Sequence, residues 1–186
     1  QIVDACNRAL NAGDKVFWVC PLIEESEKLD VAAAEDRQAA LASRFGDRVG
    51  LVHGRMKGPE KDKAMAAFVD GNVDILVATT VIEVGVDVPA ATVMVIEHSE
   101  RFGLAQLHQL RGRIGRGDKP ATCLLMYGSP LTETARSRLS IMRKTDDGFL
   151  IAEEDLKLRG AGELLGTRQS GIPEFLLADL QIHADL

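Results

Sequence analysis

The sequence predicts an α/β fold in which a parallel β-sheet carries helices on both faces. Short apolar runs alternate along the chain with longer segments of helical pattern, as in consecutive βαβ units. The runs are apolar at nearly every position, which indicates strands buried on both sides of the sheet. Five strands are expected, at residues 16–20, 49–53, 73–79, 92–97 and 122–127.

Helices are expected between these strands. Gly13, Gly46 and Gly71 are placed to end the first three of them, and Pro59 suits the first turn of the third. Residues 22–29 are expected to form a loop. The expected helices of the sheet domain cover residues 1–12, 31–45, 58–71 and 104–114.

The pattern changes after the fifth strand. Residues 132–144 predict a helix, and a second, antiparallel helix is expected at 151–158 after the break at Asp146-Asp-Gly148. A loop rich in glycine follows. We therefore predict two parts, a sheet domain at residues 1–129 and a helical-hairpin extension at 130–186.

The composition is that of an ordinary soluble globular protein. Of the 186 residues 46% are apolar and 27% are charged, and the formal net charge is −6. This charge argues against a general polyanion binder, although a local basic strip can still contact nucleic acid. The three cysteines are widely spaced and lack metal-ligand spacing, which favours free thiols and a cytoplasmic location. No apolar run is long enough for a membrane span, so no membrane partner is expected.

The two ends suggest a piece excised from a longer protein. Gln1 opens directly into a helical pattern, without a methionine, and the chain stops at Leu186 without a capping signal. We therefore expect further domains in the parent polypeptide.

The stretch from Gln106 to Gly117 carries the strongest chemical signal. Arg111, Arg113 and Arg116 are interleaved with glycines in it. Arginine offers a planar fork that matches phosphate oxygens, and glycine lets the backbone approach a ligand closely. The stretch predicts a site that grips a polyphosphate. The alternative is a solvated basic turn.

The rest of the sequence makes this only half of a site. It contains neither a G-x-x-x-x-G-K-[ST] phosphate loop nor an acidic pair at the end of a strand to hold magnesium. An arginine supplied by a second domain stabilises the charge that develops in phosphoryl transfer. Arg113 and Arg116 are three residues apart and are expected to share one helical turn, with Gln109 one turn earlier.

Several segments resemble the motifs of superfamily-two helicases. Residues 109–116 resemble the sixth motif of these enzymes, and residues 78–89 resemble the fifth. Residues 135–143, 145–156 and 158–171 resemble the translocation motif that RecG-type helicases share with the transcription-repair coupling factor. The Gly-Thr-Arg-Gln form and the short distance from the arginines to the hairpin favour the RecG type.

The resemblance implies a RecA-like second motor domain with a C-terminal helical hairpin and loop. The parent would be an ATP-dependent DNA helicase that remodels branched DNA, such as stalled forks and Holliday junctions. ATP and Mg²⁺ would be its cofactors, held mainly by a missing first motor domain. The expected partners are branched DNA and the first motor and wedge domains of the same polypeptide.

Residue roles follow from the same resemblance. Arg113 and Arg116 match the arginine-finger positions, which would make them catalytic. Gly85 and Asp87 match the pair that meets the nucleotide ribose, and Gln109 lies beside the arginines. A further set matches positions near the DNA backbone or in the translocation motif: His53, Gly54, Thr79, Thr80, Arg138, Arg159 and Gln169. For the two arginines of the extension, the alternative is an internal ion pair with a nearby acidic residue.

Two other functions remain open on the sequence. The chain could be the equivalent fragment of a transcription-repair coupling factor, or a non-catalytic nucleic-acid-binding module that keeps a motor-like fold. A mere scaffold has no physical need for the full set of matched motif residues, which argues against the second. Among the aromatic residues, Trp18 is expected in the core, and Phe102 and Phe149 are expected to pack rather than stack on bases.

Overall fold

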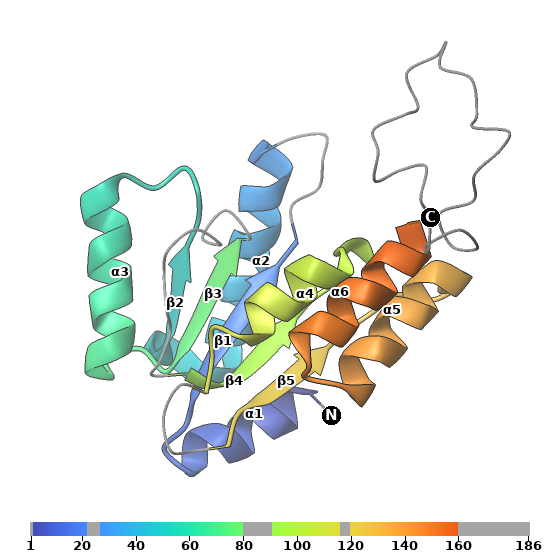
Figure 1. The fold of residues 1–186 in the computed structure, drawn as a ribbon. Helices are drawn as coiled ribbons and strands as arrows, with labels where there is room; N and C mark the ends of the chain where they lie inside the picture. Colours follow the sequence, from blue (N-terminus) through green and yellow to red (C-terminus); the bar gives the residue numbers. More distant parts are fainter. Residues whose placement is uncertain (1, 22–26, 80–90, 116–119, 160–186) are drawn as a thin grey trace, which may run out of the picture.

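The computed structural model describes residues 2–21, 27–79, 91–115 and 120–159. They form one five-stranded sheet with the order β2-β3-β1-β4-β5, and every pairing in it is parallel (Figure 1). The predicted parallel α/β fold is therefore confirmed. The strands are β1 Lys15–Cys20, β2 Val49–Val52, β3 Ile75–Thr79, β4 Ala91–Ile96 and β5 Thr122–Leu125.

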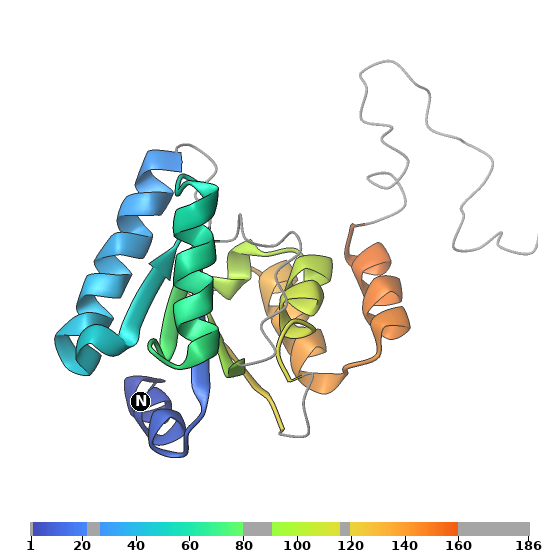
Figure 2. The ribbon, with the colours of Figure 1, turned by 90° about the vertical axis from the view of Figure 1, so that its left-hand side faces the viewer.

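Helices cover both faces of this sheet. Viewed side-on, α2 and α6 lie at opposite sides of the molecule (Figure 2). One face carries α1 (Ile2–Asn11) and α2 (Glu27–Phe45), and the other carries α3 (Gly58–Asp70) and α4 (Leu104–Arg111). Short 3-10 turns occur at Gly46–Arg48 and Ser99–Arg101.

The strand β1 shows why the strand sequences are continuously apolar. Phe17 and Val19 point into the core beneath α3 and α4, whereas Val16, Trp18 and Cys20 point into the core beneath α1 and α2. Successive side chains of a strand face opposite sides, so a strand with a core on each side needs apolar residues at all positions. The expected burial of Trp18 is confirmed, since it is only 2% exposed.

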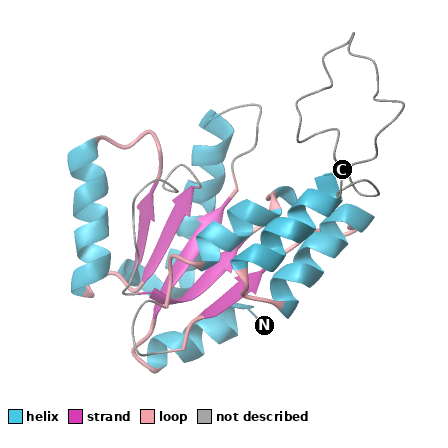
Figure 3. Cartoon of the chain, in the orientation of Figure 1, coloured by secondary structure: helices cyan, strands magenta, loops and turns pink. Residues whose placement is uncertain are grey.

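The predicted hairpin forms on the α4 side of the sheet. Its two helices, α5 (Glu133–Lys144) and α6 (Gly148–Arg159), lie side by side and are joined by a short turn (Figure 3). Met142 of α5 and Ile151 of α6 are almost fully buried in the same core as Leu107 of α4. The hairpin is therefore packed onto the sheet domain by apolar contacts. The predicted glycine-rich loop lies outside the described residues.

Two helices begin earlier than the sequence indicates. The helix α2 starts at Glu27, so the expected loop is wrong for residues 27–29, whose Glu, Lys and Leu are good helix formers. The helix α6 starts at Gly148, because the Asp147 carboxylate accepts the backbone N–H of Phe149 at 2.8 Å and so acts as an N-cap.

The two phenylalanines differ in their environment. Phe102 is 5% exposed and packs in the core, as predicted. Phe149 is 91% exposed at the start of α6, so the prediction that it packs is wrong. Phe149 is the second residue of α6, two positions after the capping aspartate.

Among the described residues, no helix combines the length and the apolar composition that crossing a membrane requires.

A substitution of the buried Phe68 tests how tightly α3 packs on the sheet. Phe68→Ala is expected to lower the free energy of unfolding by about 3–5 kcal/mol, because the fully buried ring leaves a cavity between α3 and the sheet. Urea unfolding followed by circular dichroism measures the loss. The neighbouring Val69 is 56% exposed, and Val69→Ala is the matched control, with an expected change within about 0.5 kcal/mol. Equal losses for the two variants would contradict the described packing.

Candidate functional site

The carboxyl ends of the parallel strands bring several predicted site residues to one edge of the sheet. His53 and Gly54 directly follow β2, and Thr79 is the last residue of β3. Val52 is in register with Ala78, so His53 and Thr79 lie at adjacent strand ends. In such sheets ligands bind at this edge.

Two polar atoms at this edge have unused hydrogen-bonding capacity. Thr79 is 2% exposed, and its hydroxyl has no hydrogen-bond partner among the described residues. The same holds for the buried Nδ1 atom of His53. The carbonyl of Gly54, in contrast, accepts a hydrogen bond of 2.9 Å from the Lys61 ammonium. Buried polar groups without partners are unfavourable, so this edge is suited to receive a polar ligand.

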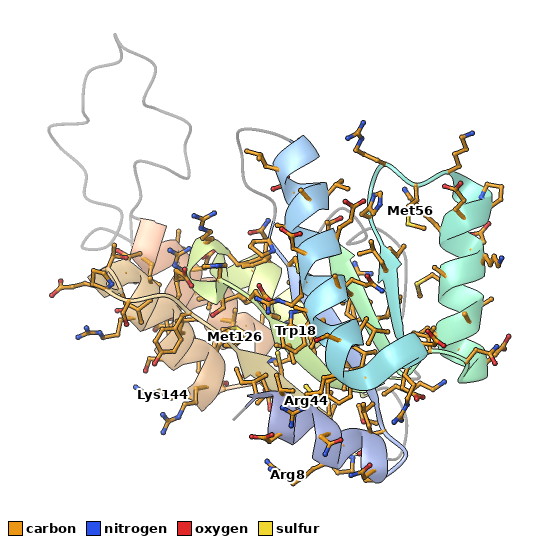
Figure 4. All side chains as sticks on the ribbon, turned by 180° about the vertical axis from the view of Figure 1, so that it is seen from behind. Arg8, Trp18, Arg44, Met56, Met126 and Lys144 are labelled. Atoms are coloured by element: carbon orange, nitrogen blue, oxygen red, sulfur yellow. The ribbon has the colours of Figure 1, made fainter. Side chains whose placement is uncertain are left out.

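Trp18, Glu97 and Arg37 form a buried polar cluster beside β1 and β4. The sequence did not predict a role for this cluster. The Trp18 indole N–H donates a hydrogen bond of 2.6 Å to the Glu97 carboxylate, which also forms an ion pair with Arg37. The guanidinium of Arg37 lies 5.6 Å from the centre of the Trp18 ring. Trp18 lies in the middle of the sheet beside α2 (Figure 4). The signal available in the sequence was a glutamate directly after a continuously apolar strand.

This cluster borders a cleft of about 490 Å³ that Cys20 and Glu97 help to line. Burial raises the pKa of the Cys20 thiol to about 12, and the nearby Glu97 carboxylate acts in the same direction against a smaller opposing effect of Arg37. The thiol is therefore protonated at neutral pH and is a poor nucleophile.

The arginine stretch begins within α4 and continues beyond its end. Gln109 is exposed on this helix, and Arg113 is half-buried two residues after its end. The backbone N–H of Arg113 donates a hydrogen bond of 3.0 Å to the Leu110 carbonyl. The helix was expected to reach residue 114, but it ends at Arg111.

Gly115 lies four residues beyond the end of α4, where the chain approaches the sheet. Its φ angle is +73°, in the left-handed region, and its backbone N–H lies 3.4 Å from the carbonyl of Ala91 at the start of β4. Arg113 therefore lies in the turn between α4 and Gly115. Arg116 lies outside the described residues, so the shared helical turn of Arg113 and Arg116 stays a prediction.

The arginine Arg111 binds the hairpin rather than lying open to a phosphate. Its guanidinium donates to the carbonyls of Met142 at 2.8 Å and Thr145 at 3.0 Å. The same nitrogen lies 2.8 Å from a carboxylate oxygen of Asp146. Sequence reasoning grouped Arg111 with the other two arginines, because nothing in the local pattern indicates which partner each side chain meets.

A second arginine, on the hairpin itself, joins the hairpin to the sheet domain. Arg138 of α5 donates to the carbonyl of Phe102 at 2.7 Å and to that of Glu100 at 3.4 Å. These carbonyls belong to the turn that precedes α4. Among the described residues, Arg138 thus bonds to backbone carbonyls and does not form the ion pair with an acidic side chain that was the alternative expectation.

The remaining predicted site residues are not covered by these contacts. Arg159 is the last residue of α6, and its side chain is not described. Five predicted residues lie outside the described part of the chain, namely Thr80, Gly85, Asp87, Arg116 and Gln169. Within residues 2–21, 27–79, 91–115 and 120–159, three or more His, Cys, Asp or Glu side chains never converge into a group that could hold a metal ion.

A substitution of Gly115 tests the left-handed turn that follows Arg113. Gly115→Ala is expected to lower the free energy of unfolding by about 1–3 kcal/mol, because the new methyl group is forced into a left-handed backbone and meets the side chain of Ala121. Thermal unfolding by calorimetry measures the effect. Gly46 has a φ angle of +63° with nothing near its added Cβ, so Gly46→Ala is the control for backbone strain alone. A smaller loss at position 115 than at position 46 would contradict the described turn.

Comparison with protein families finds two matches in this chain. Residues 1–118 match the helicase conserved C-terminal domain, and residues 145–185 match the family described as ATP-dependent DNA helicase RecG, domain 3, C-terminal. The first range ends before β5, and the second begins just before α6.

Two similar curated proteins are both named ATP-dependent DNA helicase RecG. The chain is 58% identical to the ATP-dependent DNA helicase RecG of Acidithiobacillus ferridurans over 184 residues, and 55% identical to that of Escherichia coli K12 over 182 residues. Each alignment covers 97% of this chain but 26% of the relative. The chain therefore spans about a quarter of the length of these proteins.

Solved structures agree with these relatives. A structure of RecG bound to a three-way DNA junction matches 88% of this chain and 21% of that one, with 47% identity and a TM-score of 0.71. Yeast Dbp5 bound to RNA and ADP BeF3 matches 85% of this chain and 41% of its own with a TM-score of 0.56. Its identity is 18%, so that likeness supports the fold alone.

Proposed function

Because this chain belongs to the RecG type within the helicase conserved C-terminal domain family, we propose that it is the second motor half of an ATP-dependent DNA helicase. The parent enzyme remodels branched DNA, such as stalled forks and Holliday junctions. The observation that carries this proposal is the identity of 47% to a RecG bound to a three-way junction. The relatives' shared name favours this reading over a transcription-repair coupling factor.

The chain divides into two working parts in this proposal. Residues 1–129 form the motor domain and residues 130–186 form the hairpin extension, a division supported by the separate family matches at 1–118 and 145–185. The first motor domain and the wedge domain of the same polypeptide complete the enzyme. The free thiols of the three cysteines fit a cytoplasmic location.

Among the described residues, Arg113 suits the phosphate end of ATP. Arg113 is a half-buried residue two positions after the end of α4, and a guanidinium stabilises the charge on a transferring phosphate. Gly85, Asp87, Gln109 and Arg116 are proposed to complete the nucleotide contacts of this half. Among the described residues, no three side chains of His, Cys, Asp or Glu come together to form a metal site. The first motor domain is proposed to hold Mg²⁺.

The carboxyl edge of β2 and β3 is proposed to follow the DNA backbone. His53, Gly54, Thr79 and Thr80 would hold phosphate groups through hydroxyl and backbone N–H groups, without reading the base sequence. The buried hydroxyl of Thr79 and the buried Nδ1 of His53, both without described partners, support this assignment.

The hairpin is proposed to pass the state of the nucleotide to the DNA. Arg138, Arg159 and Gln169 are the polar residues of this relay. The hydrogen bonds from Arg138 to the carbonyls of Glu100 and Phe102 support it, since they link α5 to the segment that leads into α4 and the arginine stretch.

The arginine-finger role is tested in the parent protein, with the preceding domains restored. Arg113→Ala is expected to lower DNA-stimulated ATP turnover by about 10³-fold or more, because the transition state loses a cation at the transferring phosphate. A phosphate-release assay in the presence of forked DNA measures this turnover. Arg8→Ala removes an equal charge from the exposed surface of α1, at the amino end of the sheet (Figure 4), and is expected to leave turnover unchanged.

The outcomes separate the proposals. Turnover by Arg113→Ala equal to that of the parent would contradict the arginine-finger assignment. Stimulation of the unaltered parent by linear duplex as strong as that by a fork of the same length would contradict the branched-DNA specificity. Activity that depends on a stalled RNA polymerase instead would favour the transcription-repair coupling factor.

A further inference from the structure

We propose that Arg111 is a positioning residue that locks the helical hairpin to α4 in one orientation, so that movement of the arginine stretch is transmitted to the hairpin. The inference rests on the proposed function for its consequence in the enzyme. The attachment of the hairpin to α4 through Arg111 is itself a property of the described structure, and a separate experiment tests it.

The contacts of Arg111 are directed at the backbone of the hairpin. The last carbonyls of a helix have no partner within the helix, and the Met142 carbonyl near the end of α5 is one of them. Arg111 donates to this carbonyl and to that of Thr145, which begins the turn into α6. A cation at a helix C-terminus also interacts favourably with the helix dipole.

Burial decides which of these contacts matter most. The Arg111 side chain is 18% exposed, so its hydrogen bonds to the backbone are well shielded from water. Asp146 is 94% exposed, and an ion pair with so exposed a partner contributes little. The backbone contacts therefore dominate, and a planar guanidinium suits them because it can serve several acceptors at once.

Arg111 and Arg138 together make a joint with two attachment points. Arg138 ties the middle of α5 to the carbonyls of Glu100 and Phe102, which precede α4. Arg111 ties the last residue of α4 to the end of α5. A single attachment would let two helices pivot about it, whereas attachments near both ends of α4 fix the angle between them.

The start of α6 leaves little room for movement at the same place. A Cβ atom on Gly148 would lie 3.1 Å from Nε2 of His108, so α6 begins in close contact with α4. The Nδ1 atom of His108 in turn lies 3.3 Å from the Arg111 guanidinium. The two ends of the hairpin turn are thus held by neighbouring residues of a single helix.

The joint is also close to the proposed catalytic arginine. Only Gly112 separates Arg111 from Arg113, and the backbone N–H of Arg113 is bonded to the Leu110 carbonyl. A displacement of Arg113 therefore reaches Arg111 through one turn of backbone. A purely structural role for Arg111 would instead affect the stability of the whole domain and all activities alike.

The coupling is tested in the parent protein with Arg111→Ala. ATP turnover with forked DNA is expected to stay within about twofold of the parent value, with an unchanged KM for ATP, whereas the rate of fork unwinding falls about tenfold. A phosphate-release assay and a strand-separation assay give the two rates. Arg111→Lys keeps a cation but loses the planar fork, so it is expected to restore part of the unwinding.

Lys144→Ala is the matched control. Lys144 is an exposed cation at the same end of α5, and its removal is expected to change neither the rate of ATP turnover nor the rate of unwinding. A parallel fall of turnover and unwinding in Arg111→Ala would overturn the proposal, and so would unchanged unwinding.

Hydrogen exchange of the backbone amides tests the joint without any activity. Arg111→Ala is expected to speed exchange at the end of α5 and the start of α6, residues 141–151, and to leave α4 and the sheet unchanged. Lys144→Ala should leave exchange unchanged in all of these elements. Unchanged exchange at 141–151 would overturn the proposal even if unwinding falls. If forked DNA does not stimulate ATP turnover by the parent protein, the proposed function is overturned. The exchange result would still test the attachment of the hairpin by Arg111.

Discussion

The enclosure of β1 is the constraint on which the rest of the structure depends. This strand pairs with β3 along one edge and β4 along the other, and its side chains enter both cores. It therefore fixes the spacing and direction of its two neighbours, and through them the places where β2 and β5 can pair. The edge at which His53 and Thr79 lie, and the segment that leads from β4 into α4, are positioned by this strand.

The sequence predicted the parts of the fold that depend on burial. Continuous apolar runs are found only where a strand has a core on each side, so β1 and β3 could be recognised without knowing their neighbours. Helix ends were harder to place. They depend on single side-chain contacts, such as the hydrogen bond to the carboxylate of Asp147, which local propensity reveals only in part.

The candidate site was predictable to the extent that topology decides it. Parallel strands must end at one edge, which brings His53 beside Thr79 whatever the details of packing. The partners of long polar side chains were not predictable. Arg111 and Arg113 are nearly identical in local sequence, yet Arg111 meets carbonyls more than thirty residues away. The Trp18–Glu97 bond likewise joins strands that are distant in the chain.

The strand order also sets the order in which the molecule can be completed during synthesis. The central strand β1 leaves the ribosome before the other four strands of the sheet, but Val16 must wait for Ile75 and then for Val93 before both edges of β1 are paired. Because synthesis proceeds at about 5–20 residues per second, β1 stays without both of its neighbouring strands for several seconds. A nascent chain of this kind depends on chaperones or on its α1 and α2 helices to cover that strand, and it acquires its hairpin only after the sheet has closed.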